Sequence, residues 1–131
     1  MRILKAQETN CKPCRSGLAR YYKGELVQAL ADFDKAIVLN PKISDAYNGS
    51  GLTLYSGKNQ TRQFADFDRA IAIDPNLAEA YGNRALSLLT LRWDAKAEQD
   101  LKKCFELNEP LQPLFDPLAN EIKKVRQIRH D

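Results

Sequence analysis

Two cysteines near the start of the chain form the one motif whose residue types and spacing could do chemistry. Cys11 and Cys14 enclose Lys12 and Pro13, which is the C-x-x-C spacing of dithiol oxidoreductases. A thiol at a helix N-terminus has a lowered pKa and takes part readily in disulfide exchange. The strand–helix context of a thioredoxin-like motif is missing here, however. The motif therefore favours a plain helix start, with Pro13 in the first turn and the two cysteines either free or joined locally.

The remaining residues do not complete a metal or catalytic site. A zinc site on Cys11 and Cys14 would need two further ligands, but Cys104 is expected to be buried and His130 lies at the far end. The chain has neither a glycine-rich phosphate loop nor a Gly-x-Ser-x-Gly motif. We therefore expect no enzyme activity, no metal and no cofactor. A metal shared between two chains is the remaining alternative.

The composition is that of one soluble globular domain. Of the 131 residues, 44% are hydrophobic and 28% are charged. A net charge of +3 is too small to indicate nucleic-acid binding. No apolar run approaches the roughly 18 residues that span a membrane, and residues 1–5 contain no stretch long enough for a signal peptide. We therefore expect a cytoplasmic protein that binds neither nucleic acid nor membrane.

The sequence repeats itself with a period of 34 residues, which is typical of stacked helical units. The clearest match aligns residues 31–37 with residues 65–71, and three units occupy residues 10–43, 44–77 and 78–111. Six positions recur at this spacing: Gly17, Gly51 and Ala85; Leu18, Leu52 and Leu86; Asp32, Asp66 and Asp100; Phe33, Phe67 and Leu101; Ala36, Ala70 and Cys104; and Pro41 with Pro75.

Each unit is predicted to form two helices. In the second unit, apolar and small residues at spacings of three and four mark a first helix around Tyr47 and Leu54. A turn at residues 56–59 leads to a second helix from Gln60 to Ile73, which stops at residues 74–75 because the residue before a proline avoids helical geometry. The first unit breaks at residues 24–25 and stops at 40–41, and the third breaks at 92–94 and stops near residue 110.

The recurring small residues predict close packing. A glycine inside a helix costs up to about 1 kcal/mol relative to alanine, and a close approach of two helix backbones would explain this cost at Gly17 and Gly51. Phe33 and Phe67 are then expected to fill the space between neighbouring units. The aspartates of the second helices are expected to form solvated faces with Lys35 and Arg69. These aspartates include Asp32, Asp34, Asp66 and Asp68.

These markers resemble the tetratricopeptide repeat, and the resemblance covers residues 10–111. It implies an all-α fold in which residues 1–131 form a single domain, a right-handed superhelical stack of three helix-turn-helix units plus a C-terminal capping helix. Pro13, Gln63 and Glu109 depart from the pattern, because an aromatic residue, an alanine and a proline are expected there. The matching residues are Gly17, Ala29, Phe33, Ala36 and Pro41 in the first unit, Gly51, Phe67, Ala70 and Pro75 in the second, and Ala85 and Ala97 in the third.

A helix at about residues 116–129 is predicted to cap the third unit. Asp116 suits an N-cap and Pro117 suits the first helical position. Leu118, Ile122 and Val125 form a short apolar stripe that would cover the last face of the stack. A basic amphipathic helix for a membrane or nucleic acid is the alternative, since the rest of the helix carries Lys123, Lys124, Arg126 and Arg129.

The resemblance also predicts where a partner binds. In tetratricopeptide domains the first helix of each unit lines the concave side, which is the usual binding surface. A row of leucines with flanking tyrosines would give this chain a largely apolar groove that suits a partner helix or an extended segment. Alternatively, the same leucines pack the seams between units. The residues predicted to line the groove are Arg15, Leu18, Tyr21, Asn48, Leu52, Tyr55, Asn83, Leu86 and Leu89.

One specialisation of the family can be checked residue by residue. Tetratricopeptide domains that hold the acidic C-terminus of chaperones carry lysine, arginine and asparagine at five groove positions. A carboxylate needs such charged donors, yet none of the five positions is basic in this chain. We therefore expect no chaperone-type carboxylate clamp. The five positions hold Cys14, Leu18, Gly49, Glu79 and Asn83.

The sequence thus predicts a non-catalytic module that binds a peptide or helix of a partner protein. A self-associating assembly unit, which would form a homo-oligomer, is the first alternative. Residues 1–9 are too few to cover the outer face of the first unit with another helix pair. A redox or metal-binding protein built on Cys11 and Cys14 is the second alternative.

Overall fold

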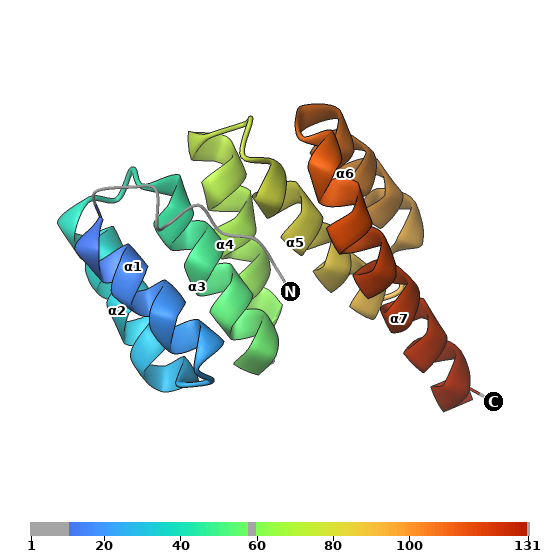
Figure 1. Ribbon diagram of the computed structural model, residues 1–131, viewed down its shortest axis with the longest axis horizontal. Coiled ribbons are helices and arrows are strands. Elements are labelled where there is room, and N and C mark those ends of the chain that lie inside the picture. Colours follow the sequence, from blue (N-terminus) through green and yellow to red (C-terminus); the bar gives the residue numbers. More distant parts are fainter. Residues whose placement is uncertain (1–10, 58–59, 131) are drawn as a thin grey trace. The chain divides into compact units, whose positions relative to one another are not determined.

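The computed structural model describes residues 11–57 and 60–130. These residues form seven α-helices and one 3₁₀ turn, and no β-strand occurs among them, so the predicted all-α class is confirmed (Figure 1). The helices are α1 (Lys12–Tyr22), α2 (Leu26–Leu39), α3 (Ser44–Gly57), α4 (Gln60–Ile73), α5 (Ala78–Thr90), α6 (Asp94–Leu107) and α7 (Gln112–His130), with the turn η2 at Glu109–Leu111 between α6 and α7.

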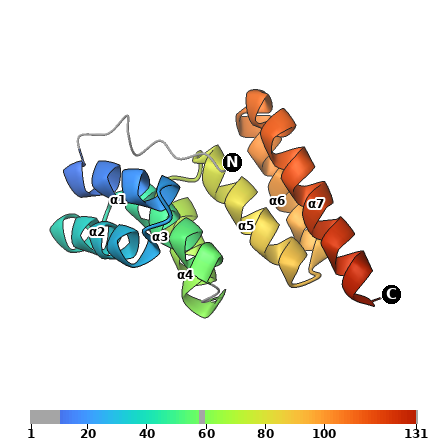
Figure 2. The ribbon, with the colours of Figure 1, turned by 60° about the horizontal axis from the view of Figure 1, so that its bottom comes forward.

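The helices belong to two compact units. Helices α1 to α4 form one unit, in which α2 packs on α1 and α3, and α3 packs on α4. Helices α5 to α7 form the other, in which α5 packs against both α6 and α7 (Figure 2). The pairs α1–α2, α3–α4 and α5–α6 match the three repeats of the sequence.

Helix ends agree with the sequence where glycine and proline mark them. Helix α4 spans the predicted Gln60–Ile73, and α2 ends at Leu39, two residues before Pro41. Gly24 follows α1 with a φ of 81°, a left-handed conformation that glycine adopts without strain. The equivalent position in the third repeat holds Arg92, with a φ of 65°. A residue with a Cβ atom adopts this conformation at a cost on the order of 1 kcal/mol.

The C-terminal helix starts earlier than the sequence predicts. Helix α7 begins at Gln112, directly after η2, and Pro117 lies inside it rather than at its first position. Asp116 is therefore not an N-cap. Its side chain accepts a hydrogen bond of 3.1 Å from Gln112, one helical turn back. The extra turn buries the whole ring of Phe115, and this burial offsets the backbone hydrogen bond that Pro117 cannot donate.

The glycines make room for phenylalanine rings. A Cβ atom added to Gly17 would lie 3.0 Å from the ring of Phe33, and one added to Gly49 would overlap the same ring. Phe33 of α2 therefore lies between the backbones of α1 and α3. A Cβ atom at Gly51 would lie 2.7 Å from Phe67 in the same way. The close contact at these glycines is thus between a helix backbone and a phenylalanine ring. The expected approach of two helix backbones stays a prediction.

The recurring aspartates bind the two helices of each repeat together. Ser16 donates to Asp32 at 2.6 Å, and Ser50 donates to Asp66 at the same distance. In the third repeat, Asp100 accepts from the guanidinium group of Arg84 in a bidentate ion pair of 2.8 Å. The expectation of a solvated face is wrong for Asp66, which is only 7% exposed. Burial raises the pKa of Asp66, while the hydrogen bond from Ser50 opposes the rise.

Arg126 of α7 joins the three helices of its unit. Its guanidinium group donates to both carboxylate oxygens of Asp94 at the start of α6, at 2.6 and 2.9 Å. The same group donates at 2.7 Å to the carbonyl oxygen of Leu89, near the end of α5. The hydrogen bond from Arg126 holds the pKa of Asp94 below its usual value. This cation satisfies a carbonyl group at the end of one helix and a carboxylate at the start of the next.

We predict that Gly49→Ala destabilises the protein. Alanine is the better helix former by about 1 kcal/mol, but overpacking a core costs about 1–3 kcal/mol. The ring of Phe33 cannot retreat, because Gly17 lies against it as well. We therefore expect a net loss of about 1–2 kcal/mol in the free energy of unfolding, measured by urea denaturation.

The matched control for this variant repeats the substitution in a Phe33→Leu background. The smaller side chain leaves room for the new methyl group, so Gly49→Ala should cost less there than in the wild type. Equal losses in both backgrounds would contradict the ring contact as the cause.

The single domain expected from the sequence remains a prediction, and we expect one cooperative unfolding transition. The fluorescence of Trp93 follows the unit of α5 to α7, whereas far-UV circular dichroism follows every helix. The two signals should therefore change at the same urea concentration. Two separate midpoints would show two domains that unfold independently.

Candidate functional site

The predicted binding residues of α1 and α3 divide into a buried row and an accessible border. Leu18 and Leu52 are buried in one core cluster that also contains Phe33, and Tyr21 packs against the edge of that cluster. Tyr21 and Tyr55 are half-buried, and the side chain of Arg15 is exposed. The leucines therefore pack the seam between the repeats, as the alternative interpretation has it, and the tyrosines remain accessible.

The predicted residues of α5 are all buried. Asn83, Leu86 and Leu89 have at most 1% of their surface exposed. The side chain of Asn48 in α3 is equally inaccessible. Six of the nine predicted groove residues are thus buried, and three are accessible to a partner without rearrangement of the core.

The first helices carry more buried polar groups than an apolar groove would need. Thr53 and Ser87 were not among the predicted site residues, although they lie one residue after recurring leucines and 34 residues apart. Thr53 donates to the carbonyl oxygen of Gly49 at 2.8 Å, which satisfies its hydroxyl group within α3. The buried polar residues of these two helices are Asp45, Asn48, Ser50 and Thr53 in α3, and Glu79, Asn83 and Ser87 in α5.

None of the side chains at the five positions that match a carboxylate clamp is basic, and all five residues are buried. Cys14 and Leu18 lie in the core cluster, and a side chain at Gly49 would overlap the ring of Phe33. Glu79 and Asn83 are both buried. One of the five positions therefore carries a carboxylate, the opposite of the charge that a bound carboxylate would need.

The two N-terminal cysteines are joined by a disulfide bond at the start of α1. Cys11 is the N-cap, and its Sγ atom accepts a 3.2 Å hydrogen bond from the backbone N–H of Cys14. The remaining cysteine, Cys104, is buried as expected, and this burial raises the pKa of its thiol to about 12. No group of three potential metal ligands occurs within residues 11–57 and 60–130.

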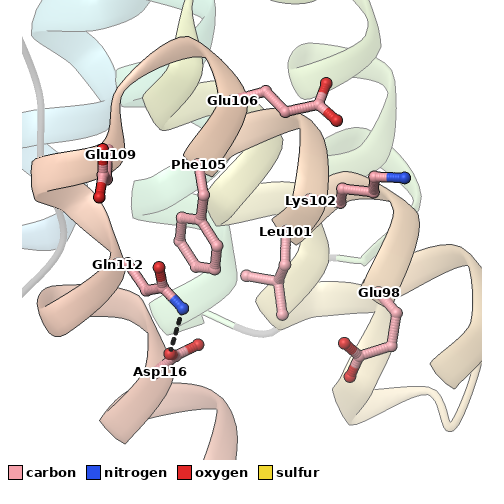
Figure 3. A pocket seen from close by; sticks show the side chains of 8 residues that line it. All are labelled: Glu98, Leu101, Lys102, Phe105, Glu106, Glu109, Gln112 and Asp116. Atoms are coloured by element: carbon pink, nitrogen blue, oxygen red, sulfur yellow. Dashed lines mark hydrogen bonds between the residues drawn. The ribbon is translucent and has the colours of Figure 1, made fainter.

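A pocket between α6 and the start of α7 is a further candidate site, which the sequence analysis did not identify (Figure 3). It combines two apolar side chains of α6 with several carboxylates. Only the three-dimensional positions of α6 and α7 bring these residues together, because they come from two helices and the turn between them. The residues that line it are Glu98, Leu101, Lys102, Phe105, Glu106, Glu109, Gln112 and Asp116.

None of the helices within the described part of the chain is long and apolar enough to cross a membrane.

A sequence model of the tetratricopeptide repeat matches residues 78–110, which cover α5 and α6. The chain matches no curated protein in sequence. Similarity to known proteins is otherwise found at the level of the fold.

Solved tetratricopeptide domains share this fold at low sequence identity. The first TPR of Spaghetti (RPAP3), bound to the HSP90 peptide SRMEEVD, is 19% identical over 97% of this chain and 94% of its own, with a TM-score of 0.73. The TPR2B domain of yeast Sti1 in its pHsp70 complex is 21% identical over 92% and 97%, with a TM-score of 0.77. The TPR domain of Arabidopsis OM64 is 20% identical over 91% and 93%, with a TM-score of 0.74.

We predict that the folded, unreduced protein exposes no reactive thiol. Cys11 and Cys14 are bonded to each other, and the raised pKa of Cys104 keeps its thiol protonated at mildly alkaline pH. Iodoacetamide followed by mass spectrometry should therefore find no label before reduction. Gentle reduction should release Cys11 and Cys14, and only denaturant should add Cys104. Rapid labelling of Cys104 in the folded protein would contradict its burial.

Proposed function

We propose that this chain, which is a tetratricopeptide-repeat protein, is a non-catalytic module that binds a peptide or helix of a partner protein on the face formed by α1 and α3. The observation that carries the proposal is the pair of half-buried tyrosines Tyr21 of α1 and Tyr55 of α3. Tyr21 packs against the core cluster of the buried leucines, and Tyr55 follows Leu52 by three residues in α3. A tyrosine ring offers apolar contact and its hydroxyl group offers a hydrogen bond, so tyrosines are enriched where proteins meet.

The buried leucines have a supporting role in this proposal. Leu18 and Leu52 fix the spacing of α1 and α3 through one shared core, and a rigid floor lowers the entropy that a partner loses on binding. Arg15, which is exposed on α1, supplies a cation at the border of the same face. A partner segment with an apolar side chain for the tyrosines and an acidic side chain for Arg15 would fit this face.

We further propose that the bound segment is not held by its C-terminal carboxylate. Domains similar in fold are named as complexes with chaperone segments, including the HSP90 peptide. In this chain the five clamp positions provide no cation, and Glu79 would repel a carboxylate. The proposed partner is therefore recognised through side chains along its length.

Self-association is a second candidate, and exposed apolar side chains on α2 favour it. Val27 and Val38 have 81% and 82% of their surface exposed, and Leu39 follows at 67%. Exposed aliphatic residues of this kind are common contact points between protein chains. Mass measured by light scattering over a range of concentrations separates this candidate from a monomeric binding module.

We predict that Tyr55→Glu and Tyr21→Glu each weaken partner binding about tenfold or more, because both place a charge on the accessible border of the face. Val38→Glu is the matched control, since it adds the same charge on the outer side of α2. The measurement compares the proteins captured by each purified variant from native extract, with circular dichroism to confirm folding. A substitution at Leu52 is unsuitable, because that side chain belongs to the core.

Loss of the same partners with Val38→Glu, or their retention by both tyrosine variants, would contradict the α1–α3 face as the site.

The absence of a carboxylate clamp is tested separately by fluorescence anisotropy with the labelled peptide SRMEEVD, which is bound in a domain of similar fold. We expect no saturable binding at micromolar concentrations of the chain. Saturable binding that requires the free carboxylate of the peptide would overturn the proposal of a clamp-free groove.

A further inference from the structure

The pocket between α6 and α7 has an apolar floor and an acidic rim. Leu101 and Phe105 project from α6 into the pocket, where Phe105 is only partly buried (Figure 3). Glu106, Glu109 and Asp116 surround these two side chains from α6, η2 and α7. Lys102 is the one cation in the lining, against the four carboxylates of Glu98, Glu106, Glu109 and Asp116, so the rim is predominantly negative. An apolar surface with such a rim is suited to an amphipathic ligand of positive charge.

The negative charge of this rim is largely uncompensated. Glu106 and Glu109 have no ion-pair partner within the described part of the chain, and Asp116 accepts only from the neutral amide of Gln112. The last turn of α6 has no basic residue, so its unpaired carbonyl groups add to the negative potential. Glu98 is the exception, because Lys123 lies 3.0 Å from it.

The repeat shows what kind of element fits beside α6 and α7. These helices begin 68 residues, or two periods, after α2 and α3. In the unit of α1 to α4, helix α4 packs on α3, where Asp66 accepts from Ser50, and it reaches α2 through the ion pair of Arg62 with Asp34. No helix of the described residues 76–130 takes the equivalent place beside α6 and α7.

We propose that this pocket is a docking site for a basic amphipathic helix of a partner protein. Apolar side chains of that helix would cover Leu101 and Phe105, and its lysines or arginines would face Glu106, Glu109 and Asp116. The site uses different helices from the α1–α3 face and extends the chain's function to a second, electrostatically selected partner.

The charges of this chain favour another protein over a second copy of the chain. Helix α7 carries four cations, Lys123, Lys124, Arg126 and Arg129, and two of them are already engaged within the unit. Arg126 binds Asp94, and Lys123 binds Glu98. A second copy could present these cations only by breaking its own contacts.

Synthetic helical peptides test the proposal. One probe is an amphipathic peptide of leucine and lysine with the length of α4, and its matched control has glutamate in place of lysine. We expect the lysine peptide alone to bind, with an affinity that falls as salt is added. Glu106→Lys combined with Glu109→Lys should weaken it about tenfold or more. Glu25→Lys combined with Glu121→Lys is the control for net charge, and Phe105→Ala tests the floor.

Equal weakening by the two double variants would overturn the proposal, because it would show attraction by net charge alone. If Phe105→Ala binds the lysine peptide as tightly as the wild type does, the apolar floor is not part of the site. A concentration-dependent dimer that disappears with Glu106→Lys and Glu109→Lys would assign the pocket to a second copy and contradict the partner proposed here. Tyr55→Glu should leave binding of the lysine peptide unchanged, so failure of this proposal is distinguishable from failure of the α1–α3 face.

Discussion

The contact between the ring of Phe33 and the backbones of α1 and α3 is the constraint on which the unit of α1 to α4 depends. Gly17 and Gly49 both face this ring: a methyl group at Gly49 would overlap it, and one at Gly17 would lie 3.0 Å from it. A fully buried phenylalanine contributes several kcal/mol of stability, of the order of 3–5 when it is truncated to alanine. This gain exceeds the roughly 1 kcal/mol that each helical glycine costs. The phenylalanine thereby fixes the distance between α1 and α3.

The proposed function follows from this spacing. With α1 and α3 held apart by Phe33, Leu18 and Leu52 belong to one core, and Tyr21 packs against its edge. Tyr55 of α3 is half-buried. The serine–aspartate pairs hold the second helices in place from the other side, since Asp66 binds Ser50 across the pair α3–α4. The proposed binding face therefore has a rigid floor of buried leucines and an adaptable rim of accessible side chains. Such a surface selects partners by shape and side-chain chemistry and needs no catalytic group.

Much of this fold follows from the sequence, because its strongest signals are local. Glycine, proline and the 34-residue period predict where helices end, and the predicted ends of α2 and α4 are confirmed. Helix α6 ends at Leu107, three residues before the expected stop near Pro110. The predicted start of α7 was wrong, because burial of Phe115 outweighs the preference of Pro117 for the first turn of a helix. The sequence could not separate a leucine that packs a seam from one that lines a groove, since both have the same spacing. It also missed the α6–α7 pocket, where Phe105 meets Asp116 only in three dimensions.

The most direct test of this account is a nuclear Overhauser measurement on the labelled protein. The packing described here predicts strong cross-peaks from the aromatic protons of Phe33 to the α-protons of both Gly17 and Gly49. Cross-peaks to both glycines would show that one ring joins α1 to α3 and sets the face between them. Cross-peaks to Gly17 alone, or to neither, would contradict the constraint from which the binding face is derived.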